Sequence, residues 1–202
     1  SSDVCSSDLF RGTDPLITGL TRRALAVEVK FPDVGAGIPE ARWTRAMTFE
    51  RLVRDKRFAS QVATTTVGQL DLDRPTEVVI ADAKGKMDRT AKLLIEAHNR
   101  AVSKNVATVI HELSVPFVGF EDIAATDVKP DFVVVAPKTK SEGDGTWLIV
   151  GDAKDYERHR SRIEDSRLLK GFLQVAVGAE SFAAWTQLPV GMDVHRWGAL
   201  AV

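Results

Sequence analysis

The chain has 202 residues, 44% of them hydrophobic and 27% charged, with a formal net charge of −1 at pH 7; this is an ordinary globular composition, with no overall attraction to nucleic acid. Its only cysteine is Cys5, which excludes disulfides and four-cysteine metal or iron–sulfur sites within this sequence and favours a reducing, cytoplasmic setting. No apolar run approaches the roughly 18 residues of a membrane span and no basic-then-apolar leader opens the sequence, so no membrane association is expected.

The first 86 residues are expected to lie outside the main fold. Residues 1–9 are similar to a translated sequencing adapter and are interpreted as a non-native tail, with a disordered polar terminus as the alternative. Residues 10–86 are predicted to form an N-terminal accessory α+β segment, with a strand over 24–31 and a helix over 39–62. That helix has six cations against three acids, a pattern typical of a phosphate-contacting helix or, more often, of a solvated helix face.

The tripeptide Asp-Ala-Lys occurs twice, each time after an apolar run. It follows Glu77–Ala81 as Asp82–Lys84 and recurs as Asp152–Lys154. The nearest preceding acids, Asp71 and Asp73, are too close to Asp82 in sequence for two strands and a loop to lie between them. The sequence therefore predicts that Asp82 and Lys84 are strand-end and turn residues.

The next stretch, Asp88–Leu113, has apolar residues at helical spacings, and Asp88 is a candidate N-cap. The β-branched residues of Val106–Ile110 disfavour a helix, so the helix either continues to Leu113 or breaks near Lys104. The pair His111-Glu112 is expected on its last turn, because Val115-Pro116 ends the helix. A short aromatic strand is expected over 116–124.

Two Val- and Ile-rich runs, Phe132–Ala136 and Trp147–Val150, are bounded by Pro and Gly and predict buried strands. The Gly-rich linker between them favours an antiparallel hairpin. In such a hairpin Asp131, at the start of the first strand, lies beside Asp152 and Lys154 at the end of the second. Two carboxylates are the hard oxygen ligands that suit Mg²⁺ or Mn²⁺, and the lysine can orient water or offset transition-state charge.

A helix is expected over 161–182, with Lys170 and Gln174 on one face because they stand four residues apart. Three arginines around its start are candidates for DNA phosphate contacts, with surface solvation as an equal alternative. A last strand is expected over 194–202, and a chain that ends within an apolar run is expected to be truncated there. The predicted buried stripe of the helix is Leu168, Leu169, Phe172, Val175, Ala176 and Ala179; the three arginines are Arg158, Arg162 and Arg167.

The sequence Pro130-Asp131, followed by Asp152-x-Lys154 and then by a helix that contains Gln174, resembles the PD-(D/E)xK nuclease superfamily, and in particular its RecB-like branch. Where that branch often has Tyr four residues after the Gln, this chain has Gly178. The resemblance implies an α/β fold over residues 87–202: a restriction-endonuclease-like core, αβββαβ, with a mixed central sheet flanked by helices and a truncated C-terminus.

The resemblance also implies a cytoplasmic hydrolase, a magnesium-dependent, DNA-binding nuclease that cleaves DNA phosphodiester bonds. Asp131 and Asp152 would bind Mg²⁺ or Mn²⁺, with His111 or Glu112 as a third ligand. Lys154 would position or activate water, and Gln174 would orient the lysine or the phosphate. Two alternatives stay open: a catalytically degenerate DNA-binding or scaffolding domain, and a plain α/β domain in which the three charged residues form a surface ion-pair cluster.

Overall fold

The computed structural model describes residues 40–117, 127–155, 163 and 165–202. The strand expected over 24–31, the adapter-like tail at 1–9 and the arginines at 158 and 162 lie outside these residues. The chain divides into two compact units, Ser1–Ala46 and Met47–Val202. All the strands of the described residues belong to the second unit, and none of the described helices is both long and apolar enough to cross a membrane.

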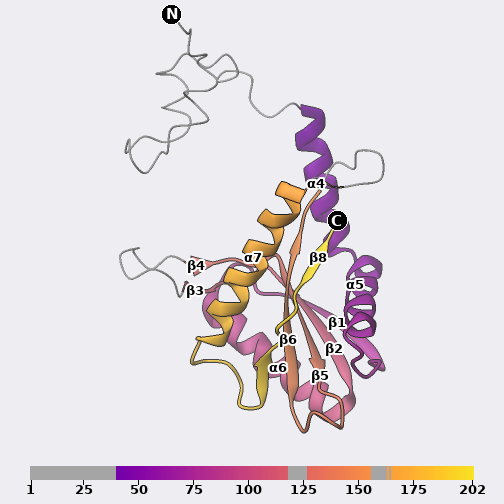
Figure 1. Cartoon of the computed structure of the whole chain (residues 1–202), viewed down its shortest axis with the longest axis vertical. Helices are drawn as coiled ribbons and strands as arrows, with labels where there is room; N and C mark the ends of the chain where they lie inside the picture. The colour runs from indigo at the N-terminus through magenta and orange to yellow at the C-terminus, as the bar shows by residue number, and fades with distance from the viewer. Residues whose placement is uncertain (1–39, 118–126, 156–162, 164) are drawn as a thin grey trace, which may run out of the picture. The chain divides into compact units, whose positions relative to one another are not determined.

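The described residues contain both helices and strands (Figure 1), and the strands β2 to β6 follow one another in the chain between helices α6 and α7. The helices of the described residues are α4 (Glu40–Arg54), α5 (Lys56–Gln69), α6 (Met87–Lys104) and α7 (Asp165–Ala183). The strands are β1 (Glu77–Asp82), β2 (Val106–His111), β3 (Val115–Pro116), β4 (Asp127–Val128), β5 (Phe132–Pro137), β6 (Thr146–Ala153), β7 (Met192–Val194) and β8 (Ala199–Ala201).

A mixed sheet of six strands forms the centre of this unit, in the order β1-β2-β5-β6-β7, with β8 also paired to β6. Strand β1 is parallel to β2, β5 is antiparallel to both β2 and β6, and β7 and β8 are parallel to β6. The two last strands pair with opposite ends of β6, β7 near Thr146 and β8 near Asp152. Strand β1, from the segment predicted to be accessory, thus extends the same sheet as its edge strand.

Helices cover both faces of the sheet, and successive residues of a strand face different helices. On β5, Val133 and Val135 pack in one apolar cluster with residues of α6 and α7. Phe132 and Val134 belong to a second cluster that contains the buried side of α5. Because both faces are covered, β5 reads in the sequence as a continuous apolar run. The predicted α/β architecture, a mixed central sheet flanked by helices, is confirmed.

The predicted hairpin is also confirmed, since β5 and β6 pair antiparallel with Phe132 opposite Gly151. Of the two ends left open for the helix that begins near Asp88, the structure has the earlier one: α6 ends at Lys104, and Asn105 adopts a left-handed backbone with φ of 53°. The next six residues form β2, and all six are buried. The β-branched residues of this stretch decide the outcome, because they pack well in a sheet core and poorly on a helix.

Three other expectations are corrected in detail. The helix expected over 39–62 is two helices, because Asp55 caps α5 with hydrogen bonds to the backbone N–H groups of Arg57 and Phe58 at 2.9 and 3.4 Å. The strand expected over 116–124 is only β3, which pairs with β4 outside the main sheet, while residues 118–126 lie outside the described residues. The strand expected over 194–202 is divided between β7 and β8.

Candidate functional site

Several polar residues singled out in the sequence lie on the side of the sheet where strands β1, β2 and β6 end and β5 begins. Strands β1, β2 and β6 run in the same direction, and β5 runs opposite to them. The carboxyl ends of the first three strands therefore meet the amino end of β5 at this edge. Asp82, His111 and Asp152 end or nearly end their strands there, and Asp131 immediately precedes β5. We call this row the carboxyl edge.

Asp152 and Lys154 form the closest ion pair at the carboxyl edge. The Lys154 Nζ donates to Oδ1 of Asp152 at 2.8 Å. The chain stays extended here because Asp152 pairs with Leu200 and the Lys154 backbone N–H donates to the carbonyl of Ala201 at 2.9 Å. Extended backbone places residues two apart on the same face, so strand β8 holds the lysine beside the acid.

Asp131 completes this cluster from the neighbouring strand. Its Oδ2 accepts a hydrogen bond from the Ala153 backbone N–H at 2.8 Å and lies 3.5 Å from Lys154 Nζ. The lysine thus contacts both acids, and Oδ2 of Asp131 and Oδ1 of Asp152 lie within about 6.3 Å, the sum of the two Nζ distances. Two oxygens bound to one small cation with bonds near 2.1 Å lie at most about 4.2 Å apart, and the hydrogen bonding between the Asp131 and Asp152 side chains keeps the two carboxyl groups near that separation.

Asp152 is held in an environment that opposes its negative charge. Its side chain is only 7% exposed, and its Oδ2 is buried without a hydrogen-bond partner among the described residues. Burial raises the pKa of Asp152 to about 6; the hydrogen bond from Lys154 works against this shift, while hydrogen bonding to Asp131 and the charge of Asp131 add to it. A buried carboxylate oxygen without a donor is costly, so a cation or donor at Oδ2 would be strongly favoured.

Lys154 stays protonated despite its partial burial. Desolvation alone would lower the pKa of its ammonium group, but the hydrogen bond to Asp152 and the charges of Asp131 and Asp152 together raise it. A lysine with a raised pKa cannot remove a proton from water near neutral pH. Its chemistry at this site is therefore electrostatic: it can position a water or an anionic oxygen and offset developing negative charge.

The two candidates for a third metal ligand lie elsewhere. His111 ends a strand rather than a helix, and it pairs with Phe132, whose ring centroid is 6.4 Å from its own. Directly paired residues share a face of a sheet, so His111 faces the α5 side with Phe132, while Asp152 alternates with Gly151 and faces the α7 side. Glu112 forms an ion pair with Arg54 at 2.5 Å. Neither residue joins the two acids.

His111 is nonetheless in an unusual environment. Its side chain is buried, with Nε2 left without a hydrogen-bond partner. The pKa of His111 is lowered, mainly by burial and also by the nearby charge of Arg54. A hydrogen bond to the backbone carbonyl of Asp131 and the charges of Asp82 and Glu112 act in the opposite direction. This bond connects β2 to the residue that carries the first acid.

Helix α7 approaches the acids through a residue that the sequence did not single out. A Cβ built on Gly171 would lie 3.5 Å from Oδ2 of Asp152 and 2.8 Å from a methyl group of Leu200. The helix therefore packs against the site through a glycine, and a glycine within an amphipathic helical pattern is the signal that indicates such a close approach.

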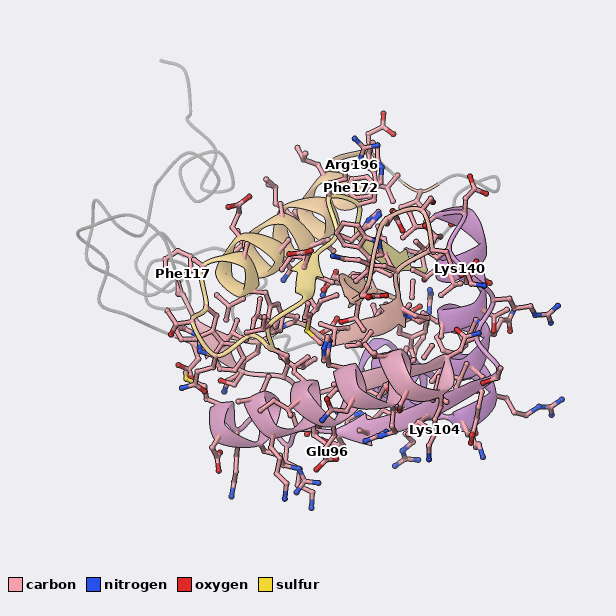
Figure 2. The ribbon with its side chains drawn as sticks, turned by 90° about the horizontal axis from the view of Figure 1, so that it is seen from below. Glu96, Lys104, Phe117, Lys140, Phe172 and Arg196 are labelled. Atoms are coloured by element: carbon pink, nitrogen blue, oxygen red, sulfur yellow. The ribbon has the colours of Figure 1, made fainter. Side chains whose placement is uncertain are left out.

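The buried face of α7 consequently differs from the predicted stripe. Gly171, Val175, Gly178 and Phe182 are buried, whereas Leu169 and Phe172 are 57% and 56% exposed (Figure 2 labels Phe172). Gln174 is exposed, one turn beyond Gly171. Gly178, where the resemblance leads one to expect Tyr, would place a Cβ within 3.0 Å of Val150 and 3.2 Å of Pro130, and so the helix lies too close to the sheet for a larger residue.

The described residues contain no group of three or more His, Cys, Asp or Glu side chains arranged to hold a metal. The available protein ligands are the two carboxylates of Asp131 and Asp152. Mg²⁺ is commonly held by one or two carboxylates together with waters and substrate phosphate. The unpartnered Oδ2 of Asp152 and the hard oxygen donors fit such a site.

Comparisons with known proteins give no family for this chain. No family model matches it, and no curated protein matches it. Among solved structures it is similar to the Legionella pneumophila effector protein RavZ, residues 20–502, with 10% sequence identity and a TM-score of 0.24. The match covers 63% of this chain and 36% of that one, so the chain spans about a third of that protein.

Proposed function

We propose that this chain is a metal-dependent nuclease that hydrolyses DNA phosphodiester bonds at the carboxyl edge. The observation that carries the proposal is the convergence of Asp131, Asp152 and Lys154 from two paired strands, with one carboxylate oxygen of Asp152 buried and unpartnered. Two acids and one ammonium in this arrangement would bind a divalent cation and the phosphate that it attracts.

The order of elements supports the same proposal. Without the short strands β3, β4 and β7, the elements from α6 to β8 are helix α6, strands β2, β5 and β6, helix α7 and strand β8, which is the order αβββαβ. The middle strand of the three is antiparallel to its neighbours, and the last strand is parallel to β6. This order is compatible with the restriction-endonuclease-like core that the motif resemblance implies, and β1 would then be an added edge strand. The fold alone does not assign an activity, so the proposal rests on the two acids and the lysine.

In the proposed reaction Asp131 and Asp152 would hold Mg²⁺ or Mn²⁺ through their carboxylate oxygens. The ion would supply charge neutralisation and a more acidic bound water. Lys154 keeps its proton and would orient the attacking water or the non-bridging phosphate oxygen between the two acids. The Ala153 N–H fixes the orientation of the Asp131 carboxylate. Gln174 would contact substrate from α7 only through its exposed side chain.

The proposal is tested by replacing Asp152 with Asn and Lys154 with Ala and measuring cleavage of supercoiled and linear DNA with Mg²⁺. Both changes should abolish cleavage while leaving the fold intact by circular dichroism. Asp82→Asn, in the other Asp-Ala-Lys tripeptide at the same edge, is the matched control and should cleave like the wild type. Cleavage that survives Asp152→Asn would overturn the proposal.

One observation favours a second candidate, a DNA-binding or scaffolding domain with a degenerate metal site. Lys154 Nζ already lies 2.8 Å from Asp152 and 3.5 Å from Asp131, so the lysine itself can neutralise the acids in place of a metal. Calorimetric titration with Mn²⁺ separates the two candidates. A nuclease site should bind Mn²⁺ and lose that binding on Asp131→Ala, whereas a degenerate site should show no binding that depends on Asp131.

A further inference from the structure

The turn between β1 and α6, residues Ala83–Lys86, is a second polar feature of the carboxyl edge, and we call it the lysine turn. Its backbone forms hydrogen bonds with the end of β2 and within the turn. The Ala83 N–H donates to the His111 carbonyl at 2.9 Å, and the Gly85 N–H donates to the Glu112 carbonyl at 2.7 Å. The Lys86 N–H donates to the Ala83 carbonyl at 3.1 Å. Ala83 itself is fully buried.

Two exposed ammonium groups extend from this fixed backbone, those of Lys84 and Lys86. Within the described residues neither lysine forms an ion pair, in contrast to Lys138 and Lys154, which are paired with Asp193 and with the site acids. Lys84 has a left-handed backbone with φ of 54° and Gly85 one with φ of 64°. Both ammonium groups are therefore without an ion-pair partner in the described part of the chain.

The lysine turn has a defined position relative to the acid pair. Strand β1 is separated from β6 by β2 and β5, so the two Asp-Ala-Lys tripeptides are three strand spacings apart on the same edge. At about 4.8 Å per spacing the separation is about 14 Å. Phosphates of one strand of duplex DNA follow each other every 3.4 Å along the axis, so about 14 Å corresponds to a phosphate some four nucleotides away.

We propose that Lys84 and Lys86 bind a backbone phosphate of the nucleic acid whose scissile phosphate lies at Asp131 and Asp152. The inference rests on the proposed function and adds to it the surface that holds the substrate. It also accounts for the tripeptide Asp82–Lys84. Asp82 shapes the turn by accepting a hydrogen bond from the Lys84 N–H at 2.6 Å, while Lys84 and Lys86 contact the phosphate. Contacts of this kind carry no base specificity and depend strongly on salt.

The test measures binding without cleavage, by fluorescence anisotropy of a labelled 20-base-pair DNA duplex in EDTA at several salt concentrations. Lys84→Gln/Lys86→Gln should weaken binding at least about fivefold at low salt and reduce the slope of log K against log salt by about 0.9, the value for one lost phosphate contact. Lys84→Arg/Lys86→Arg should retain the affinity and the slope. Both lysines are exposed, so circular dichroism should show an unchanged fold.

The matched control removes the same charge from the other end of the sheet. Lys104 ends α6 and Lys140 lies in the β5–β6 loop (both labelled in Figure 2), and both are exposed. Lys104→Gln/Lys140→Gln should leave affinity and slope unchanged. An equal loss in the control, no loss in the lysine-turn variant, or a wild type that binds no duplex would each overturn the inference.

A separate readout distinguishes this inference from the proposed function. Bis(p-nitrophenyl) phosphate is a small diester without a neighbouring backbone phosphate, so its hydrolysis with Mn²⁺ reports on the acid pair alone. The lysine-turn variant should hydrolyse it like the wild type. Loss of this hydrolysis in the lysine-turn variant would overturn the inference, because the lysines would then act on the acid pair itself. Survival of this hydrolysis in Asp152→Asn would overturn the proposed function whatever the anisotropy shows.

Discussion

The two Asp-Ala-Lys tripeptides, Asp82–Lys84 and Asp152–Lys154, are identical in sequence and differ in structure. Ile80-Ala81 precedes the first and Val150-Gly151 the second, and both tripeptides begin at the carboxyl edge. At the first, the Asp82 carboxylate accepts from the Lys84 backbone N–H and the chain turns to the left-handed region. At the second, the chain stays extended and the Lys154 side chain returns to Asp152.

The neighbouring strands explain the difference. Among the described strands β1 pairs only with β2, and after Asp82 the chain turns into α6. Strand β6 has β5 on one side and β8 on the other, and the hydrogen bond from Lys154 N–H to the Ala201 carbonyl continues the ladder past Ala153. A lysine two residues after an acid reaches that acid only where the ladder continues. Tertiary pairing therefore decides which copy becomes a candidate site.

The largest difference between the two tripeptides is expected when the acid of each is replaced. Asp152→Asn should lower DNA cleavage at least about 100-fold, since a bound metal supplies several kcal/mol of transition-state stabilisation and 1.36 kcal/mol is tenfold in rate. Asp82→Asn should change the rate less than about twofold. Rates are compared under single-turnover conditions with Mg²⁺, and equal losses in both variants would erase the distinction between the copies.

The second largest effect is expected from replacing the residue before each acid. A Cβ on Gly151 would lie 2.2 Å from the ring of Phe132, so Gly151→Ala should destabilise the protein by about 3 kcal/mol, the upper end of overpacking costs. Ala81 is the matched position in β1, and Ala81→Gly should cost no more than about 1 kcal/mol. Urea denaturation measures both free energies of unfolding. A Gly151→Ala variant as stable as the wild type would contradict the close packing of β5 on β6.

The pH dependence of stability should identify the buried acid. Burial raises the pKa of Asp152 to about 6, above its ordinary value of 3.8, so the folded chain binds this proton more tightly than the unfolded chain. The protonated Asp152 carboxyl group therefore stabilises the folded chain below about pH 4, and this stabilisation is lost as the pH rises through about 6.

Asn does not titrate, so the stability of Asp152→Asn relative to wild type should increase by about 2 kcal/mol between pH 4 and pH 7. Urea midpoints are measured across this range in EDTA, so that no metal binds the acids. Parallel pH profiles of the two proteins would show that the Asp152 carboxyl group is not held in an unfavourable environment.

The smallest effect is expected at the lysine of the first copy. Lys84 has a φ of 54°, a conformation that costs a non-glycine residue roughly 1–2 kcal/mol and that glycine adopts freely, at some cost in entropy. Lys84→Gly should therefore stabilise the protein by about 0.5 kcal/mol, whereas Lys154→Gly, in extended backbone, should destabilise it. Thermal unfolding with identical buffers measures both. Destabilisation of both variants would argue against a strained turn at Lys84.

The sequence predicted the features that depend on local pattern. The hairpin followed from two apolar runs, and the roles of Asp82 and Lys84 followed from sequence spacing. The sequence left open whether the helix breaks near Lys104, because Val106–His111 is apolar enough to continue a helical stripe, and only pairing with β1 and β5 makes it a strand. His111, expected on the last turn of a helix, consequently lies on a strand and faces α5.

The buried face of α7 was predicted incorrectly for a different reason. Large residues such as Leu169 and Phe172 were expected inside, whereas the helix approaches the sheet through Gly171 and Gly178. Close approach depends on the absence of side chains, which a search for apolar stripes ignores. The grouping of Asp131 with Asp152 and Lys154 was accessible from the sequence because all three belong to one hairpin.

Strand β8 is synthesised after all the other elements that form the proposed site. Asp131 and Asp152 come from adjacent hairpin strands, so their half of the site can assemble soon after both strands have been synthesised. The alignment of Lys154 with Asp152 waits for residues 199–201 to pair with β6. We therefore expect ribosome-bound chains to remain unable to cleave DNA until these residues have emerged, which assays on stalled nascent chains of increasing length would reveal.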